Sequence, residues 1–264
     1  MFMAYSGEAR WRDSAGEEYT ARLGEPLSAE QTARAWRTAL DAHGDWIPSV
    51  LQAAHTRLGQ LRAAGVPDAG GLVIATDQTA ARDYAELLTA ITGKAPTLVL
   101  SDDPKSTSRI SQFAESDDEW MIAVRMVSEG VDVPALDAVL FLTPRGSQVD
   151  VVQSVGRVMR KAPGKEYGYI ILPVGIPSGV APEAALKDSK KYKVIWSVLN
   201  ALRSHDDRFE AMVNHIDLNQ DRDDRLDVIP VTVDDDSTVV VPTNEHGEQT
   251  VLDLPFENAQ EWRD

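Results

Sequence analysis

The stretch GLVIATDQTAARDYAELLTAI, residues 71–91, decides the fold class. Its first five residues carry no charged or polar side chain, which is typical of a strand that is buried on both faces of a sheet. Asp77 follows as a helix N-cap, and a helix is predicted from there to about Ile91. A buried strand that leads directly into a helix is the first half of a β–α–β unit.

The same alternation continues downstream. Further strands are predicted at PTLVL (96–100), WMIAV (120–124), AVLFL (138–142) and YGYIIL (167–172). Helices are expected between them at 104–115 and 147–160. Strands that alternate with helices of this length indicate a parallel sheet with right-handed crossovers. The sequence therefore predicts an α/β domain over residues 67–176.

Extensions are expected on both sides of this domain. Upstream, residues 1–27 read as a hairpin with a turn at Ser-Ala-Gly, and Ser28 with Gln31 forms a capping box that opens a helix to about His43. A second helix is expected to about Ala64. Downstream, a helix is expected over 181–214, followed by a hairpin of VIPVTV and TVVVP. The predicted division is 1–66, a hairpin and helical extension; 67–176, the α/β domain; 177–220, a helical extension; and 221–264, an acidic tail.

Composition narrows the class of protein. The chain has 264 residues, 43% of them hydrophobic, which is enough to bury a sizeable core. It has no cysteine, so disulfide frameworks and thiolate metal sites are excluded. The five histidines show no metal-ligand spacing. Without a signal sequence or an apolar run of membrane length, the chain is expected to be a soluble cytoplasmic protein that does not enter membranes.

Negative charge is concentrated at the C-terminal end. The formal net charge is −16, and residues 221–264 hold thirteen acidic and three basic residues, a net charge of −10. Basic residues cluster only at 157–165 and 187–193. The basic stripe that is usual in nucleic-acid-binding proteins is therefore reduced to small patches.

One of these patches begins within QSVGRVMR, residues 153–160. At 100° per residue, Gln153, Arg157 and Arg160 fall within about 60° of one another, while the valines face the other way. Two guanidinium groups that point in one direction suit a phosphate group. A solvated basic helix face is the alternative interpretation.

A second candidate site is the loop VRMVSEGVDVP, residues 124–134. Gly130 permits a backbone turn close to a ligand, and the Asp132 carboxylate can accept a hydrogen bond from a ribose hydroxyl. Ligands of parallel sheets gather at the carboxyl ends of the strands, where this loop is predicted to lie. An ordinary crossover loop with a helix cap is the alternative.

In their order and spacing, these stretches resemble the motifs of the second RecA-like domain of superfamily-two helicases and DNA translocases. The resemblance rests on GLVIATDQTAARDYAELL, VRMVSEGVDVP and QSVGRVMR and covers about residues 65–176. Residues 1–134 look more like the actinobacterial DEAD/DEAH-box helicases. The later segment DAVLFLTPRGSQVDVVQSVGRVMRKAPGKEYGYIILPVGIPSGV is similar to the helicase portion of type ISP restriction-modification enzymes. The implied fold is a RecA-like parallel sheet flanked by helices, with helical extensions at both ends.

The resemblance also implies roles for individual residues. Arg157 and Arg160 match arginines that reach the γ-phosphate of ATP held by a partner lobe, and arginine fingers of this kind accelerate hydrolysis. The residues expected to contact nucleotide are Gly130, Asp132 and Gln153. The residues near positions that meet the nucleic-acid backbone are Thr76, Asp77, Arg125 and Ser128. DNA is the expected nucleic acid, and RNA stays open.

The phosphate cradle of such an ATPase is not in this sequence. No G-x-x-x-x-G-K-[ST] motif occurs, since Gly93-Lys94 and Gly164-Lys165 lack both the earlier glycine and the following Ser or Thr. Asp117-Asp118-Glu119 precedes a predicted strand and is interpreted as a turn. ATP and Mg²⁺ are therefore expected to be held mainly by a first RecA-like lobe, without which the chain is inactive as an ATPase. The alternative is a degenerate, helicase-derived acidic module that binds or inhibits a protein.

Overall fold

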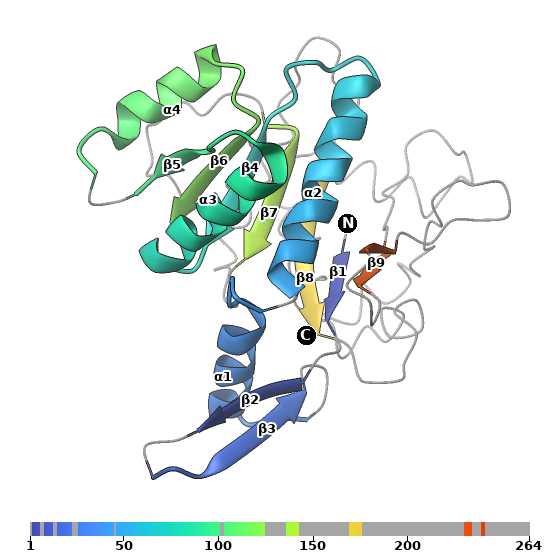
Figure 1. The fold of residues 1–264 in the computed structure, drawn as a ribbon, viewed down its shortest axis with the longest axis vertical. Coiled ribbons are helices and arrows are strands. Elements are labelled where there is room, and N and C mark those ends of the chain that lie inside the picture. The colour runs from blue at the N-terminus through green and yellow to red at the C-terminus, as the bar shows by residue number, and fades with distance from the viewer. Residues whose placement is uncertain are drawn as a thin grey trace, which may run out of the picture.

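The computed structural model describes residues 2–5, 8–12, 15–22, 26–44, 46–100, 103–124, 136–142, 169–175, 230–233 and 239–240. These residues form an α/β structure whose parallel sheet is flanked by helices (Figure 1). The helices predicted at 147–160 and 181–214 lie outside the described residues.

The predicted parallel sheet is confirmed. Its central strands are β4 (Gly71–Ala75), β5 (Thr97–Val99), β6 (Trp120–Val124), β7 (Ala138–Leu142) and β8 (Tyr169–Gly175). They lie in the spatial order β5-β6-β4-β7-β8, and every neighbouring pair is parallel. All five residues of β4 are buried, as expected for a strand with a neighbour on each side and no alternation of polar residues.

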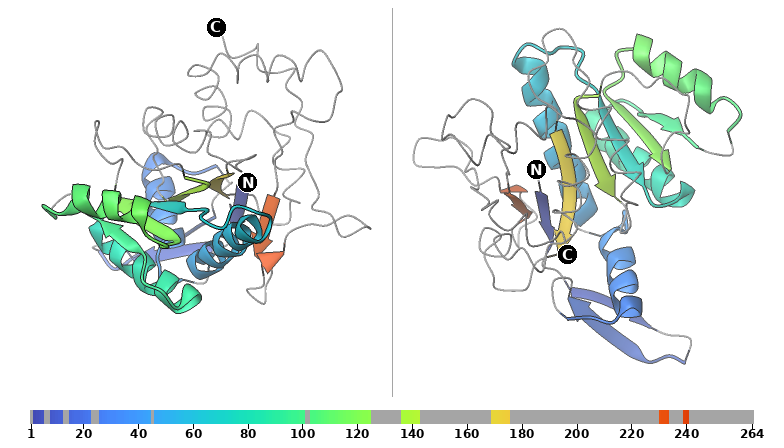
Figure 2. Two further views of the ribbon diagram at one scale, coloured as in Figure 1. Left: turned by 90° about the horizontal axis from the view of Figure 1, so that it is seen from above. Right: turned by 180° about the vertical axis from the view of Figure 1, so that it is seen from behind.

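Two helices cover one face of these strands. α2 (Trp46–Ala63) and α3 (Gln78–Thr92) lie side by side over the sheet (Figure 1), and from behind the strands stand in front of α2 (Figure 2). The core between them is apolar and includes Leu51, Leu58, Val73 and Leu88. α4 (Ser106–Glu115) contacts the edge strand β5, and the Arg109 guanidinium donates to the Leu98 carbonyl at 3.0 Å.

The predicted helix starts are confirmed at two positions. Asp77 is the N-cap of α3 and accepts a hydrogen bond from the backbone N–H of Ala80. Ser28 and Gln31 form both hydrogen bonds of the capping box that opens α1 (Ala29–Ala39). α1 ends earlier than predicted, because the Asp41 carboxylate accepts from the backbone N–H of His43 and so favours a turn over another helical turn.

The N-terminal hairpin is confirmed only in part. β2 (Glu8–Arg12) and β3 (Glu18–Arg22) pair in antiparallel register and pack on α1, which places them away from the large sheet (Figure 1). The prediction that residues 2–5 belong to the same hairpin was wrong. β1 (Phe2–Tyr5) instead pairs in parallel with β8, because its apolar sequence suits a sheet interior and the polar sequence of β2 does not.

The hairpin predicted near the C-terminal end is also observed. β9 (Pro230–Val233) and β10 (Val239–Val240) pair in antiparallel register. β9 additionally pairs in parallel with β1, which extends the full sheet order to β10-β9-β1-β8-β7-β4-β6-β5. The large sheet therefore includes strands from both sides of residues 67–176.

Specific side chains fix the amino ends of the central strands. Asp137, a buried residue just before β7, accepts a hydrogen bond from the backbone N–H of Gly70 at 2.9 Å. The predicted core residue Trp120 is 2% exposed, and its indole ring lies directly against Gly71 of β4. The other predicted core tryptophan, Trp196, lies outside the described residues. Within the described ranges, no helix is both long and apolar enough to cross a bilayer.

Candidate functional site

The carboxyl edge of the sheet is where the sequence predicts the site. Ala75, the last residue of β4, stands opposite Val124 of β6 on one side and Leu142 of β7 on the other. Three neighbouring strands therefore end level with one another. This carboxyl edge is the usual place for ligands in parallel sheets.

The predicted site residues within the described structure are Thr76 and Asp77. The others lie outside the described residues and keep their predicted roles as hypotheses: Arg125, Ser128, Gly130, Asp132, Gln153, Arg157 and Arg160.

Thr76 links two strand ends at this edge. Its side chain is exposed at the edge, and the Oγ1 hydroxyl donates a hydrogen bond to the Leu142 carbonyl at 3.0 Å. The bond joins the end of β4 to the end of β7, just before the segment that carries QSVGRVMR. A hydroxyl that donates in this way still has acceptor capacity for a further partner.

Asp77 has a structural role in the described residues. Its backbone is extended, with φ −153° and ψ 178°, and its Oδ1 accepts from the Ala80 N–H at 2.9 Å. A carboxylate at this position also interacts favourably with the positive end of the α3 helix dipole. The contact of Asp77 with nucleic acid stays a prediction.

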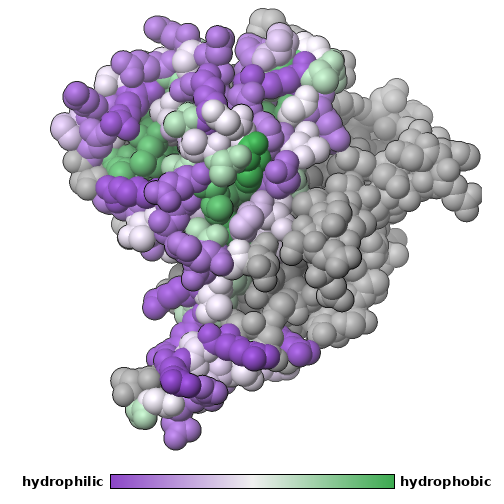
Figure 3. All heavy atoms as spheres, viewed as in Figure 1, coloured by the Kyte–Doolittle hydropathy of each residue, from purple (hydrophilic) through white to green (hydrophobic). Residues whose placement is uncertain are grey.

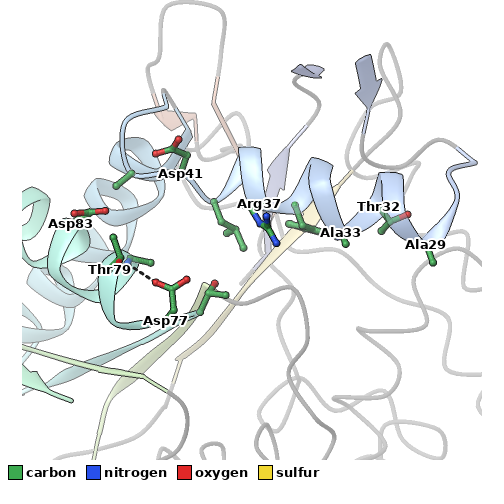
Figure 4. Close-up of a pocket in the computed structure, with 13 residues that line it drawn as sticks. Ala29, Thr32, Ala33, Arg37, Asp41, Asp77, Thr79 and Asp83 are labelled. Atoms are coloured by element: carbon green, nitrogen blue, oxygen red, sulfur yellow. Dashed lines mark hydrogen bonds between the residues drawn. The ribbon is translucent and has the colours of Figure 1, made fainter. Parts of the chain in front are cut away.

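A cleft of about 910 Å³ lies next to this edge, between α1 and the start of α3 (Figure 4). It is lined by Ala29, Thr32, Ala33, Trp36, Arg37, Leu40, Asp41, Ala42, Thr76, Asp77, Thr79, Ala80 and Asp83. Sequence reasoning missed this cleft. Its two walls come from separate segments of the chain, so no single stretch of sequence indicates it, and the N-cap role of Asp77 accounts for that side chain without any ligand.

The charged side chains of the cleft are unevenly distributed. Arg37 extends from α1 into the cleft, whereas Asp77 and Asp83 belong to the α3 side and Asp41 follows the end of α1 (Figure 4). The backbone N–H of His43 lowers the pKa of Asp41, and partial burial of the carboxyl opposes this shift. The cleft therefore holds three carboxylates and one guanidinium, a formal charge of −2.

The apolar part of the cleft is centred on Trp36. This half-buried indole lies 6.4 Å, between ring centroids, from the buried ring of Trp46. Around the cleft the surface of α1 and the β2–β3 hairpin is mostly hydrophilic (Figure 3). Among the described residues no three His, Cys, Asp or Glu side chains gather as potential metal ligands.

Comparison with known proteins identifies the central part of the chain. Residues 74–162 match the family model described as the helicase conserved C-terminal domain. The uncharacterized protein Rv2917 of Mycobacterium tuberculosis strain H37Rv is 55% identical over 192 residues, which are 73% of this chain and 32% of that protein. The chain thus spans about a third of the length of this relative.

Two further similarities cover smaller shares. The probable helicase A859L of African swine fever virus, isolate Pig/Kenya/KEN-50/1950, is 36% identical over 95 residues, 36% of this chain and 10% of the viral protein. The solved structure of the ATP-dependent type ISP restriction-modification enzyme LlaBIII bound to DNA is 33% identical, with a TM-score of 0.47, over 67% of this chain and 13% of that one. The family match and the parallel sheet with its flanking helices lead to one conclusion: residues 74–162 of this chain carry a helicase conserved C-terminal domain, on a RecA-like fold.

Proposed function

We propose that the chain supplies the second motor lobe of an ATP-dependent DNA helicase or translocase. The observation that carries the proposal is the register of β4 with β6 and β7, in which Ala75 stands opposite both Val124 and Leu142. This register places the ends of β6 and β7, after which the two helicase-like motifs follow in the sequence, at one edge of the sheet. The match of residues 74–162 to the helicase C-terminal domain covers both motifs.

In this proposal each predicted residue has a defined role. Arg157 and Arg160 donate to the γ-phosphate of ATP and stabilise the charge that develops in the transition state. The residues that contact nucleotide are Gly130, Asp132 and Gln153. The residues that meet the DNA backbone are Thr76, Asp77, Arg125 and Ser128. The similarity of residues 137–180 to type ISP restriction-modification enzymes favours DNA over RNA as the track.

The proposal requires a first RecA-like lobe, in the same polypeptide or in a partner. The sequence has no phosphate loop, and the described residues gather no metal-ligand cluster. ATP and Mg²⁺ are therefore held mainly by that first lobe, and the arginines of this chain complete the site. On its own the chain should not hydrolyse ATP.

The test is ATP turnover by this chain mixed with its cognate first lobe and duplex DNA. Arg157→Ala and Arg160→Ala should each lower turnover steeply, by about 10³–10⁵-fold for a residue that acts as an arginine finger. Arg82→Ala is the matched control, because Arg82 is an exposed arginine of α3 outside the cleft. Turnover equal to that of the unaltered chain in both finger variants would overturn the proposal.

A second candidate function is favoured by the charge of residues 221–264. A segment with a net charge of −10 repels a phosphate backbone, so it suits a helicase-derived module that binds or inhibits a protein. DNA binding should be measured with and without residues 241–264, a deletion that leaves β9 and β10 in place. Salt-sensitive binding that strengthens after the deletion supports the motor lobe. No binding by either form, together with an isolated protein partner, supports the module.

A further inference from the structure

We propose that the cleft between α1 and the start of α3 docks a segment of a partner protein that carries basic and apolar side chains together. The cleft includes Thr76 and Asp77 of the proposed DNA contacts, but the inference does not depend on the proposed roles of Arg157 and Arg160. It rests on the volume of the cleft, on its apolar lining around Trp36, and on the sign of its charges.

The size and lining of the cleft suit a side chain or two of a bound segment. A volume of about 910 Å³ lies within the range of roughly 300–1,000 Å³ that ligand pockets occupy. The half-buried Trp36 lines the cleft, and its ring lies 6.4 Å, between centroids, from the buried ring of Trp46. Tryptophan and arginine are the residue types that most often dominate the binding energy of protein interfaces.

The net negative charge of the cleft favours a positively charged segment of a partner protein. The side chains of Asp83 and Arg37, which both line the cleft, have no hydrogen bond or ion pair with another side chain among the described residues. Asp41 and Asp77 each use Oδ1 for a local hydrogen bond, to His43 and Ala80 respectively, and each keeps a second carboxylate oxygen. With three carboxylates against one guanidinium, lysine or arginine of a partner is attracted.

A nucleic-acid strand is the competing occupant, because the cleft adjoins the edge at which DNA is proposed to run. Phosphate groups inside the cleft would be repelled by Asp41 and Asp83, and Arg37 is the one cation of its lining that would attract them. The same substitution of a charged residue should therefore have opposite effects on the binding of a basic peptide and on the binding of a nucleic-acid strand. Removing the charge of Arg37 should strengthen binding of a basic peptide and weaken binding of a strand.

The experiment uses the absence of cysteine from this sequence. Ala33→Cys places a single thiol in the exposed wall of the cleft, where an environment-sensitive dye reports occupancy locally. Ser108→Cys, on the exposed side of α4 and outside the cleft, is the matched control. The probes are a peptide that alternates arginine and leucine, one that alternates glutamate and leucine, and oligothymidine.

The expected result is a saturable signal from the arginine–leucine peptide at Ala33→Cys and none at Ser108→Cys. In the Ala33→Cys chain, Asp83→Asn should weaken binding by about 1.4- to 5-fold, the effect of one exposed ion pair, and Arg37→Gln should strengthen it. Glu115→Gln, an exposed carboxylate of α4, should leave it unchanged. Thermal denaturation should show that these surface variants keep their fold.

Several results would overturn the proposal. These are no response at Ala33→Cys, an equal response at Ser108→Cys, equal binding of the glutamate–leucine peptide, or charge effects of the opposite sign. Binding of oligothymidine that Arg37→Gln weakens would assign the cleft to nucleic acid instead.

Discussion

The contact between Gly71 and Trp120 predicts a large effect from one added methyl group. A Cβ at position 71 would lie 2.4, 2.6 and 2.8 Å from three atoms of the Trp120 six-membered ring. The ring has little room to move, because Trp120 is 2% exposed. The backbone of β4 is equally constrained, since it is hydrogen-bonded to β6 and β7. Gly71→Ala must therefore distort either the ring or the sheet.

The expected cost is that of overpacking a closely packed core. Such insertions destabilise proteins by about 1–3 kcal/mol, and contacts this short place Gly71→Ala toward the upper end of that range. For a chain of this size, each kcal/mol lowers the melting temperature by about 2–4 °C. Urea denaturation followed by circular dichroism measures the free energy of unfolding, and thermal denaturation measures the shift.

Two further variants show whether the clash is the cause. Gly59→Ala in α2 has no heavy atom within 4 Å of the added Cβ and should stabilise the protein by about 0.5–1 kcal/mol, the usual gain for glycine to alanine in a helix. Trp120→Leu removes the three clashing atoms, so Gly71→Ala should cost almost nothing in that background. Additive effects of Gly71→Ala and Trp120→Leu would refute the reasoning, as would a Gly71→Ala chain of unaltered stability.

Three other predictions follow from hydrogen bonds of the described residues. Tyr84→Phe should lower the free energy of unfolding in urea by about 1–3 kcal/mol, because it leaves the buried Leu40 carbonyl, 2.6 Å from the Tyr84 hydroxyl, without a donor. Burial raises the pKa of Asp118, but hydrogen bonds from Thr97 and Lys94 outweigh it, so the pKa is lowered from 3.8. Asp118 therefore stabilises the fold above pH 3.8, and this stability is lost as the pH falls through the lowered pKa. In that range the urea midpoint of Asp118→Asn should depend less on pH than the midpoint of the unaltered chain. Asp77→Ala should cost about 0.5–2 kcal/mol in urea denaturation through loss of the α3 cap, whereas Asp77→Ser should keep most of it.

The sequence was sufficient for elements whose signals are local. The uniform apolar runs predicted all five central strands, and the side chains of Ser28 and Asp77 predicted the starts of α1 and α3. These predictions succeeded because a strand buried on both faces and a capped helix each leave a pattern within a few residues.

The features that the sequence did not predict are contacts between segments that lie far apart in the chain. Nothing near Phe2–Tyr5 shows that its neighbours are β8 and β9, and the cleft exists only because α1 stops beside the first turn of α3. The bond from the Thr76 hydroxyl to the Leu142 carbonyl could not be anticipated from either segment alone, and the predicted contact of Thr76 with nucleic acid stays a hypothesis.

The position of β1 between β8 and β9 has a consequence for biosynthesis. Phe2 and Met3 are translated more than two hundred residues before their partners Pro230 and Val231. Pairings of such high contact order form slowly, and a strand that waits for its partner exposes an unpaired edge meanwhile. Nascent chains should therefore depend on chaperones until β9 has been translated.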